Sequence, residues 1–343
     1  MRQGIAVAGN LTVDYIKIVD SYPREGNLST ILTLDKSIGG APANVSINLS
    51  KIDSSIPIQV IGVIGDDEDG QYFIDTLSRN GIDTSQIRRD YTIGTSFTDV
   101  ISVESTGNRT FFHYRGANKI FSVQHFDFSK IKAKLLHMGY ALLLDALDSE
   151  DDEYGTVMAR VLSMAQSQGI KTSLDVVSEN SDRFSRVIPP SLKYCNYFIV
   201  NELEASLTTG IPDRDSNGQL IIENMEKICR KLISMGVNDL AVVHAPEGGF
   251  AMESDGNYYI QPSLKLPEGY IKGTVGAGDA FCAGMLYSLY NGWDTKKALE
   301  IAVSAAACCL SHVNTTDGMK DISTIEEVYR TMEKRNFCNH NGY

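Results

Sequence analysis

Residues 272–284 read KGTVGAGDAFCAG, a glycine-rich turn that leads directly into an apolar segment. Beyond Asp279, the apolar residues Phe281, Met285 and Leu289 recur at helical spacing, so we expect a helix to begin at this turn. The first N–H groups of a helix have no partner inside it, and together with the helix dipole they attract phosphate. The stretch therefore predicts an anion site with one carboxylate beside it.

That carboxylate needs an explanation, because Asp279 would repel a bound phosphate. Two interpretations are open from this stretch alone: Asp279 caps the helix, or it accepts a proton from a substrate. Two better-known phosphate motifs fail. The chain contains no GxxxxGK[ST] P-loop, and Phe281 stands where the GxGxxG dinucleotide fingerprint needs its third glycine or alanine. The missing fingerprint argues against a dehydrogenase.

Two segments resemble the signatures of the ribokinase-like carbohydrate kinases, also called the phosphofructokinase B family. Residues 273–281, GTVGAGDAF, are similar to the C-terminal signature DTxGAGDxF. Residues 39–49, GGAPANVSINL, are similar to the N-terminal signature of two glycines followed by an asparagine in a helix. The resemblance spans roughly residues 4–320. It implies an α/β fold with a doubly wound, mostly parallel sheet, helices on both faces and a small β-sheet lid.

The resemblance also implies an activity, the transfer of the γ-phosphoryl group of ATP to a hydroxyl of a sugar or sugar derivative. Asp279 would be the general base, and the amides of Gly276, Ala277 and Gly278 would hold the transferred group. The family's NxxE motif matches Asn201 and Glu204, and Glu204 would help hold Mg²⁺ through water. ATP would contact Asn201, Gly248, Gly276 and Gly278. The substrate would contact Asp14, Gly39, Gly40, Asn44, Arg109, Arg115 and Asp148.

Some of these matches to the family are imperfect, and others have a purely structural explanation. Gly273 replaces an aspartate that helps some family members bind a monovalent cation, and Ala245 replaces a glycine in the segment under the nucleotide. A solvated strand face would explain Arg109 and Arg115 equally well, and Glu204 would also suit the first turn of a helix. By resemblance, residues 298–310 and 312–318 wall the adenine, although a buried alanine-rich helix explains the first range as well.

The rest of the chain fits one domain, residues 1–333, with a tail over 334–343. Alternating apolar and polar residues predict short strands in two lid segments, about 12–37 and 93–120. Strands and helices then alternate, which favours a parallel sheet. We expect a buried first strand at 4–8 and further elements at 60–65, 69–80, 140–144, 153–168, 171–176, 197–200, 225–235 and 240–243.

Composition narrows the possible partners and the compartment. The net charge of -12 and the pI near 5.0 disfavour nucleic acids and anionic membranes as partners. Six cysteines without a CxxC pair fit a reducing cytoplasm. We expect neither a signal peptide nor a spanning segment of about 20 apolar residues. A homodimer formed through the lid is a possible assembly.

Two other functions stay open at this point. A nucleoside kinase of the same fold would need an apolar slot for a base under the lid. A catalytically silent sugar-binding regulator would lack the base, whereas Asp279 is present.

Overall fold

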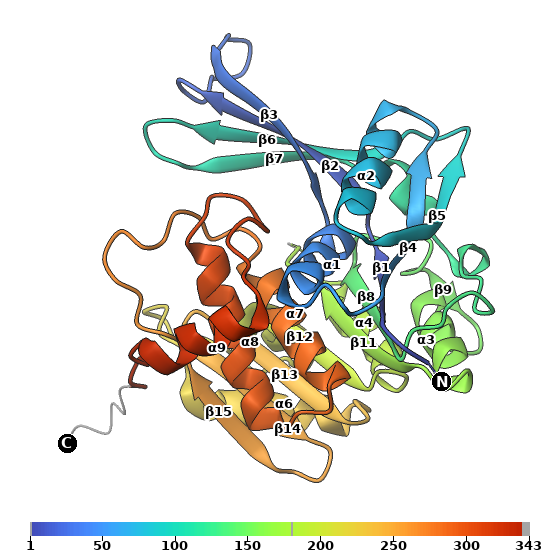
Figure 1. Cartoon of the computed structure of the whole chain (residues 1–343), viewed down its shortest axis with the longest axis vertical. Coiled ribbons are helices and arrows are strands. Elements are labelled where there is room, and N and C mark those ends of the chain that lie inside the picture. Colours follow the sequence, from blue (N-terminus) through green and yellow to red (C-terminus); the bar gives the residue numbers. More distant parts are fainter. Residues whose placement is uncertain (1, 180, 338–343) are drawn as a thin grey trace.

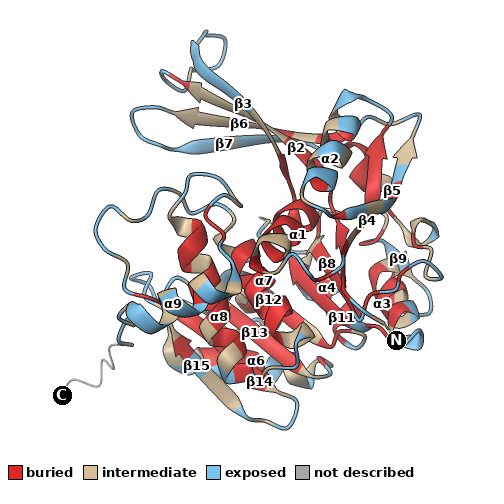
Figure 2. Ribbon diagram, viewed as in Figure 1, coloured by how far each residue is buried: buried red, intermediate tan, exposed pale blue. Residues whose placement is uncertain are grey.

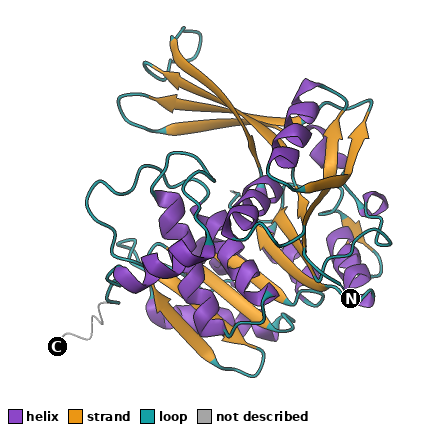
Figure 3. Ribbon diagram, in the orientation of Figure 1, coloured by secondary structure: helices purple, strands orange, loops and turns teal. Residues whose placement is uncertain are grey.

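The computed structural model describes residues 2–179 and 181–337, and a large mixed sheet forms its centre (Figures 1 and 3). The strand order is β15-β14-β13-β12-β11-β8-β1-β4-β5, and every pair is parallel except β13–β14 and β14–β15. The strands are β1 Ile5–Gly9, β4 Ile58–Gly65, β5 Asp83–Asp90, β8 Leu135–Ala141, β11 Lys171–Val176, β12 Tyr197–Asn201, β13 Leu240–Ala245, β14 Gly248–Glu253 and β15 Tyr258–Pro262.

Helices cover both faces of this sheet, so most residues of its central strands are buried (Figure 2). In β1, Ile5 and Val7 join one apolar core, while Ala6 and Ala8 join the other, as the alternation of a strand requires. The first core includes side chains from α1 Ala41–Ile52, α2 Glu68–Arg79, α7 Ala277–Tyr290, α8 Thr295–Leu310 and α9 Ile322–Thr331. The second includes side chains from α3 Val157–Ser167, α4 Phe184–Leu192, α5 Glu202–Thr209 and α6 Ile222–Ser234.

The order of the strands reverses beside β1. From β1 the chain builds outward through β4 and β5 on one side, and then returns to place β8, β11, β12 and β13 on the other. In open α/β sheets, ligands bind outside the carboxyl ends of the strands where such a reversal opens a crevice. The fold therefore points to the ends of β1 and β8 as the place for a site.

A second sheet projects from the body as a separate layer, and we call it the lid (Figure 1). Its order is β3-β2-β6-β7, with β2–β6 parallel and the outer pairs antiparallel. Its strands are β2 Thr12–Val19, β3 Ile31–Gly39, β6 Ser96–Val103 and β7 Arg109–Tyr114. Each of the two segments in which the sequence predicts lid strands contains two strands of this sheet. Two short 3₁₀ helices follow, Gly116–Ile120 and Val123–His125.

The structure differs from the expected elements in two places. The strand expected at 140–144 is β8, which ends at Ala141, because Tyr140 and Leu142 adopt positive φ angles that turn the chain out of the sheet. The helix expected at 153–168 begins only at Val157, since β9 Glu150–Asp151 and β10 Gly155–Thr156 form a hairpin before it.

The predicted tail has two parts. Lys334 pairs with Leu264, and the Phe337 ring lies 5.6 Å from the Phe250 ring, so residues 334–337 pack onto the body. Residues 338–343 lie outside the described residues. Within the described ranges, no helix combines the length and apolar character needed to cross a bilayer.

Candidate active site

The glycine-rich turn lies at the N-terminus of α7, as its sequence predicts. Gly276 precedes the helix with φ of 83°, and a Cβ at this position would approach Thr315 to 2.7 Å. Only glycine fits both the left-handed backbone and this close contact. Gly273 lies against the carbonyl oxygens of His312 and Val313, which a Cβ would meet at 3.0 and 2.9 Å. The family's aspartate would need this segment to shift.

Asp279 lies in the first turn of α7 and does not cap it. Its Oδ2 accepts a hydrogen bond from Asn44 Nδ2 at 2.8 Å. The Tyr140 hydroxyl lies 3.0 Å from Oδ1 and 2.9 Å from Oδ2. The Thr315 hydroxyl in turn donates to Asn44 Oδ1 at 2.8 Å, which fixes the amide orientation. The cap interpretation is therefore wrong, and this carboxylate is held by side chains from α1 and β8.

The surroundings of Asp279 tune it for proton transfer near neutral pH. Burial raises the pKa of the Asp279 carboxyl to about 7, and the charge of Asp175 acts in the same direction. The hydrogen bonds from Asn44 and Tyr140 oppose this rise. Burial and the neighbouring carboxylate also raise the pKa of Tyr140 well above its ordinary value, so its hydroxyl stays protonated and donates. A general base is most effective when its pKa is close to the working pH.

Tyr140 is the residue of the site that sequence reasoning missed. Its φ of 61° is unusual for a residue other than glycine, and strain of this kind persists only where the surroundings hold it. The Tyr140 N–H donates to Asp175 Oδ1 at 2.5 Å, and this bond anchors the turned backbone. The sequence alone carries no signal for Tyr140, because a tyrosine at the end of a strand is ordinary.

The lid meets the body close to Asn44. Asp14 of β2 lies opposite Thr98 of β6 in the strand register, and burial raises the pKa of the Asp14 carboxyl to about 6. A Cβ on Gly39 would lie 2.2 Å from Asp14 Oδ2, so glycine leaves room for this carboxylate at the end of β3. Helix α1, which carries Asn44, begins two residues later. The predicted substrate residues Asp14, Gly39, Gly40 and Asn44 are thus brought to one corner.

Two adjoining cavities open at the start of α7. The first, of about 240 Å³, is lined by Asp279, Tyr140, Asp175 and Glu204 among others. The second, of about 370 Å³, is more apolar and is lined by Gly248, Phe281 and four residues of α8. Asn201, His244 and Gly278 line both cavities. The arrangement offers one space beside the base and another beyond the helix N-terminus.

Asn201 and Glu204 form a reciprocal cap at the start of α5. Asn201 Oδ1 accepts from the Glu204 N–H at 2.8 Å, and Glu204 Oε2 accepts from the Asn201 N–H at 3.0 Å. The Ser178 hydroxyl donates to Oε1 at 2.7 Å. Burial raises the pKa of the Glu204 carboxyl to about 8. Glu204 therefore lies in the first turn of α5, which is one of the two positions predicted from the sequence. It also lines the first cavity.

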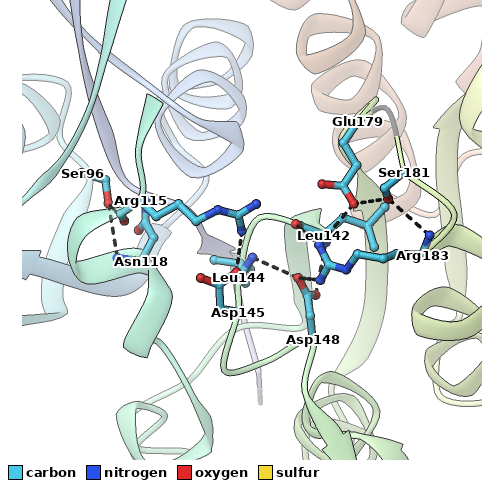
Figure 4. Close-up of polar contacts among 10 residues, drawn as sticks. All are labelled: Ser96, Arg115, Asn118, Leu142, Leu144, Asp145, Asp148, Glu179, Ser181 and Arg183. Atoms are coloured by element: carbon cyan, nitrogen blue, oxygen red, sulfur yellow. Dashed lines mark hydrogen bonds and ion pairs between the residues drawn. The ribbon is translucent and has the colours of Figure 1, made fainter. Parts of the chain in front are cut away.

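None of the seven predicted substrate residues is among the residues that line either cavity, including Arg109, Arg115 and Asp148. Arg109 begins β7 at the distal end of the lid. Arg115 is paired with Asp145 at 2.5 Å, and the Asp148 carboxylate accepts from the N–H groups of Leu142 and Leu144, both at 3.1 Å, and from Arg183 at 3.2 Å (Figure 4). Asp148 therefore secures the turn that follows Tyr140. The loop 312–318, which the resemblance predicts beside adenine, places Thr315 against Asn44 and Gly276.

Comparison with known proteins decides the family. The family model described as pfkB family carbohydrate kinase matches residues 2–322. This chain belongs to the pfkB family. The match covers nearly the whole chain, so the protein is a carbohydrate kinase and therefore a phosphotransferase.

Individual relatives agree with this assignment. The kinase is 24% identical over 338 residues to a 5-dehydro-2-deoxygluconokinase of Clostridium botulinum (strain Alaska E43 / Type E3), with 92% of this chain and 91% of the relative covered. An Arabidopsis thaliana ribokinase solved with ribose and ATP superposes with a TM-score of 0.79 at 21% identity, covering 96% of this chain and 99% of that one. A Cryptococcus neoformans ribokinase with ADP gives 0.69 at 17% identity, covering 95% and 99%. The predicted ribokinase-like fold is confirmed.

The Tyr140–Asp279 contact generates a pH prediction. As the predicted general base, Asp279 would act only when ionised, so kcat/KM should rise with pH through about 7. Tyr140→Phe removes a donor to the ionised carboxylate, so the pKa of Asp279 should increase and the acidic limb should move up by about one pH unit. The pH profile of kcat/KM measures this shift. An unchanged limb in Tyr140→Phe would show that the contact does not tune the base.

Proposed function

We propose that the kinase transfers the γ-phosphoryl group of ATP to a hydroxyl of a small sugar or sugar acid bound beside Asp279. The observation that carries this proposal is the buried Asp279 carboxylate, which is held by Asn44 and Tyr140 at the N-terminus of α7. The name of the clostridial relative makes 5-dehydro-2-deoxygluconate the first acceptor to test, and ribose the second.

In the proposed mechanism, each group of the site has one task. Asp279 accepts the proton of the acceptor hydroxyl as the hydroxyl attacks phosphorus. The N–H groups of Gly276, Ala277, Gly278 and Asp279 face the charge that develops on the transferred group. The nucleotide takes the apolar cavity against α8, which Gly248 and Phe281 also line. Asp14 binds acceptor hydroxyls from the lid, and lid closure would exclude water.

The residues near the first cavity suit Mg²⁺, which prefers oxygen ligands and keeps several waters. Glu204 and Asp175 supply carboxylates there, and Asn201 supplies an amide. A buried carboxyl such as Glu204, whose pKa is raised by desolvation, becomes easier to ionise next to a cation. We propose that Glu204 helps hold Mg²⁺ through water, and that the ion neutralises phosphate charge.

The proposed acceptor class is tested by measuring ADP release with a panel of compounds. The panel contains 5-dehydro-2-deoxygluconate, neutral sugars, sugar phosphates and nucleosides, and ³¹P NMR identifies the product. The proposal requires the highest kcat/KM for a sugar or sugar acid. A nucleoside as the best substrate would overturn it in favour of the nucleoside kinase alternative.

Asp279→Asn should reduce kcat by about 10²–10⁴-fold, since the amide keeps the shape of the carboxylate but cannot take a proton. Nucleotide binding, measured by calorimetry, should be nearly unchanged and serves as the control for folding. Retention of more than half of the wild-type kcat would exclude Asp279 as the base.

Asp14 and Asn44 should give different kinetic effects, although both lie near the acceptor. Asp14→Ala should chiefly raise the KM for the acceptor, because its hydrogen bonds are made in the ground state as well as in the transition state. Asn44→Ala should also lower kcat, since Asn44 holds the base. Steady-state kinetics separate the two, and identical effects on KM alone would contradict the geometry.

We further propose a homodimer formed through the lid. By register, Ile16, Val100 and Phe111 share the lid face of Asp14, and Phe111 is 58% exposed. Phe112, on the opposite face, is 54% exposed and supplies a matched control. Phe111→Asp should turn a dimer into a monomer in light scattering, whereas Phe112→Asp should not. A monomeric wild type would exclude this assembly.

We place the enzyme in a reducing compartment, the cytoplasm. The five cysteines within the described residues are all buried and form no disulfide there. Cys338, the sixth, lies outside those residues. Free buried thiols of this kind fit a protein that folds under reducing conditions.

A further inference from the structure

A cluster of potential metal ligands lies one turn beyond Asp279 on α7. Cys282 of α7 faces His137 of β8, and Asp175 of β11 completes the group. The His137 Nε2 atom is 3.6 Å from Cys282 Sγ and 3.6 Å from Asp175 Oδ2. The three ligand atoms lie within 4.8 Å of one another, and all three residues are buried. His137 and Cys282 have no role in the proposed transfer step, whereas the carboxylate of Asp175 has one.

The spacing of these atoms fits a tetrahedral ion. Zinc binds cysteine sulfur at about 2.3 Å and histidine nitrogen at about 2.0–2.1 Å, so two such ligands at a tetrahedral angle lie about 3.5 Å apart. The observed separation of 3.6 Å between Sγ and Nε2 matches this edge. The Asp175 carboxylate oxygen and Cys282 Sγ lie within 4.8 Å of each other, and a rotation of the carboxylate would shorten this distance.

Two of the three ligands are also oriented by partners of their own. His137 Nδ1 lies 3.0 Å from Ser173 Oγ, and a proton on Nδ1 would leave the Nε2 lone pair facing Cys282 and Asp175. Metal-binding histidines typically use their second nitrogen in this way. Asp175 Oδ1 is held by the Tyr140 N–H, which leaves Oδ2 toward the cluster. At 3.6 Å, Nε2 and Oδ2 are too far apart to share a proton.

The cluster opens onto the active-site cavity. Asp175 and Cys282 both line the cavity of about 240 Å³ that contains Asp279 and Tyr140. An ion held by three protein ligands would have its fourth position on this side, within reach of solvent. The mixture of thiolate, imidazole and carboxylate selects borderline-soft cations, while Mg²⁺ prefers oxygen ligands alone.

We propose that His137, Asp175 and Cys282 form a site for a thiophilic divalent cation, with Zn²⁺ as the probe, and that its occupancy inhibits the kinase. Binding replaces the thiol proton of Cys282 by a metal–sulfur bond, and the proton passes to water. The ion draws Asp175 toward itself and away from the Tyr140 N–H, so Tyr140 loses the anchor that aims its hydroxyl at Asp279. The metal-binding part of this proposal does not depend on the proposed function, whereas the inhibition part rests on the proposed function.

The binding test uses the full-length protein, freed of metal by a chelator, without nucleotide. Co²⁺ replaces Zn²⁺ as a spectroscopic probe, because a thiolate ligand gives a sulfur-to-metal charge-transfer band that Asp279 and Glu204 cannot give. Wild type should bind one equivalent with this band, and Zn²⁺ should displace it. Cys282→Ser and His137→Gln should lose the band and weaken Zn²⁺ binding at least about 100-fold, since second-shell changes alone cost about 10–100-fold.

Cys229→Ser is the matched control, because Cys229 is equally buried but lies on α6 in the other core. It should retain the band and the affinity. Thermal melts without Zn²⁺ show whether each variant is folded. Added Zn²⁺ should raise the Tm of wild type and Cys229→Ser but not of Cys282→Ser. Absence of the band in wild type, or its persistence in Cys282→Ser, would overturn the site.

Inhibition is measured separately, as the fraction of each protein's own activity lost to Zn²⁺ in excess Mg²⁺ and ATP. Wild type and Cys229→Ser should lose most of their activity at a Zn²⁺ concentration that leaves Cys282→Ser largely uninhibited. Equal inhibition of all three would refute the regulatory part of the proposal. A wild type that binds Co²⁺ but phosphorylates no sugar would instead count against the proposed function.

Discussion

The site depends on one constraint, the burial of an ionisable carboxylate at the start of a helix. Asp279 is 5% exposed, and its two oxygens are occupied by Asn44 and Tyr140. Burial disfavours the charge, while the hydrogen bonds and the positive end of the α7 dipole favour it. The balance leaves the pKa of Asp279 at about 7. A carboxyl poised in this way can both accept and release a proton under ordinary conditions.

The fold supplies the partners of Asp279 from distant parts of the chain. Reversal of the strand order beside β1 leaves the carboxyl ends of β1 and β8 open, so that Tyr140 projects into the crevice. Asn44 arrives from α1, directly after the lid strand β3, and Thr315 arrives from the loop after α8. Side chains from α1, β8 and the loop after α8 therefore form one hydrogen-bonded group with Asp279.

The two cavities lie on either side of the α7 N-terminus, which would place an acceptor and a nucleotide next to each other. The cavities adjoin at Asn201, His244 and Gly278, next to the first turn of α7. Burial lowers the pKa of His244 to about 4, so this ring stays neutral and adds no charge that would compete with the amides for phosphate. An acceptor on one side and a nucleotide on the other would meet at the helix N-terminus.

The sequence predicts local chemistry well and tertiary partners poorly. The turn at Gly276, the lid strands and the capping pair Asn201 and Glu204 follow from short-range rules, since glycine, alternation and capping act within a few residues. Tyr140 could not be predicted, because its role comes from a strained turn held by Asp175, Leu142 and Asp148, which are brought together only by folding.

Other predictions show the same limit in different ways. The resemblance placed Asp148 next to the substrate, but the structure uses its carboxylate to tie down backbone N–H groups. Arg109 lies in a segment whose alternating apolar and polar residues predict a lid strand. Its distance from the active site depends on the length of that strand, which the alternation does not define. The cap interpretation of Asp279 was reasonable from the sequence, and only the side-chain contacts exclude it.

The most direct test of this account is the titration of the Asp279 carboxyl itself. Carbon-13 NMR of the kinase labelled at aspartate carboxyls, with Asp279→Asn used for assignment, measures its pKa in the free enzyme. The account predicts a value of about 7, far above the ordinary value of 3.8. A titration close to the ordinary value would contradict it, because the carboxylate would then be an exposed or fully compensated anion rather than a buried base.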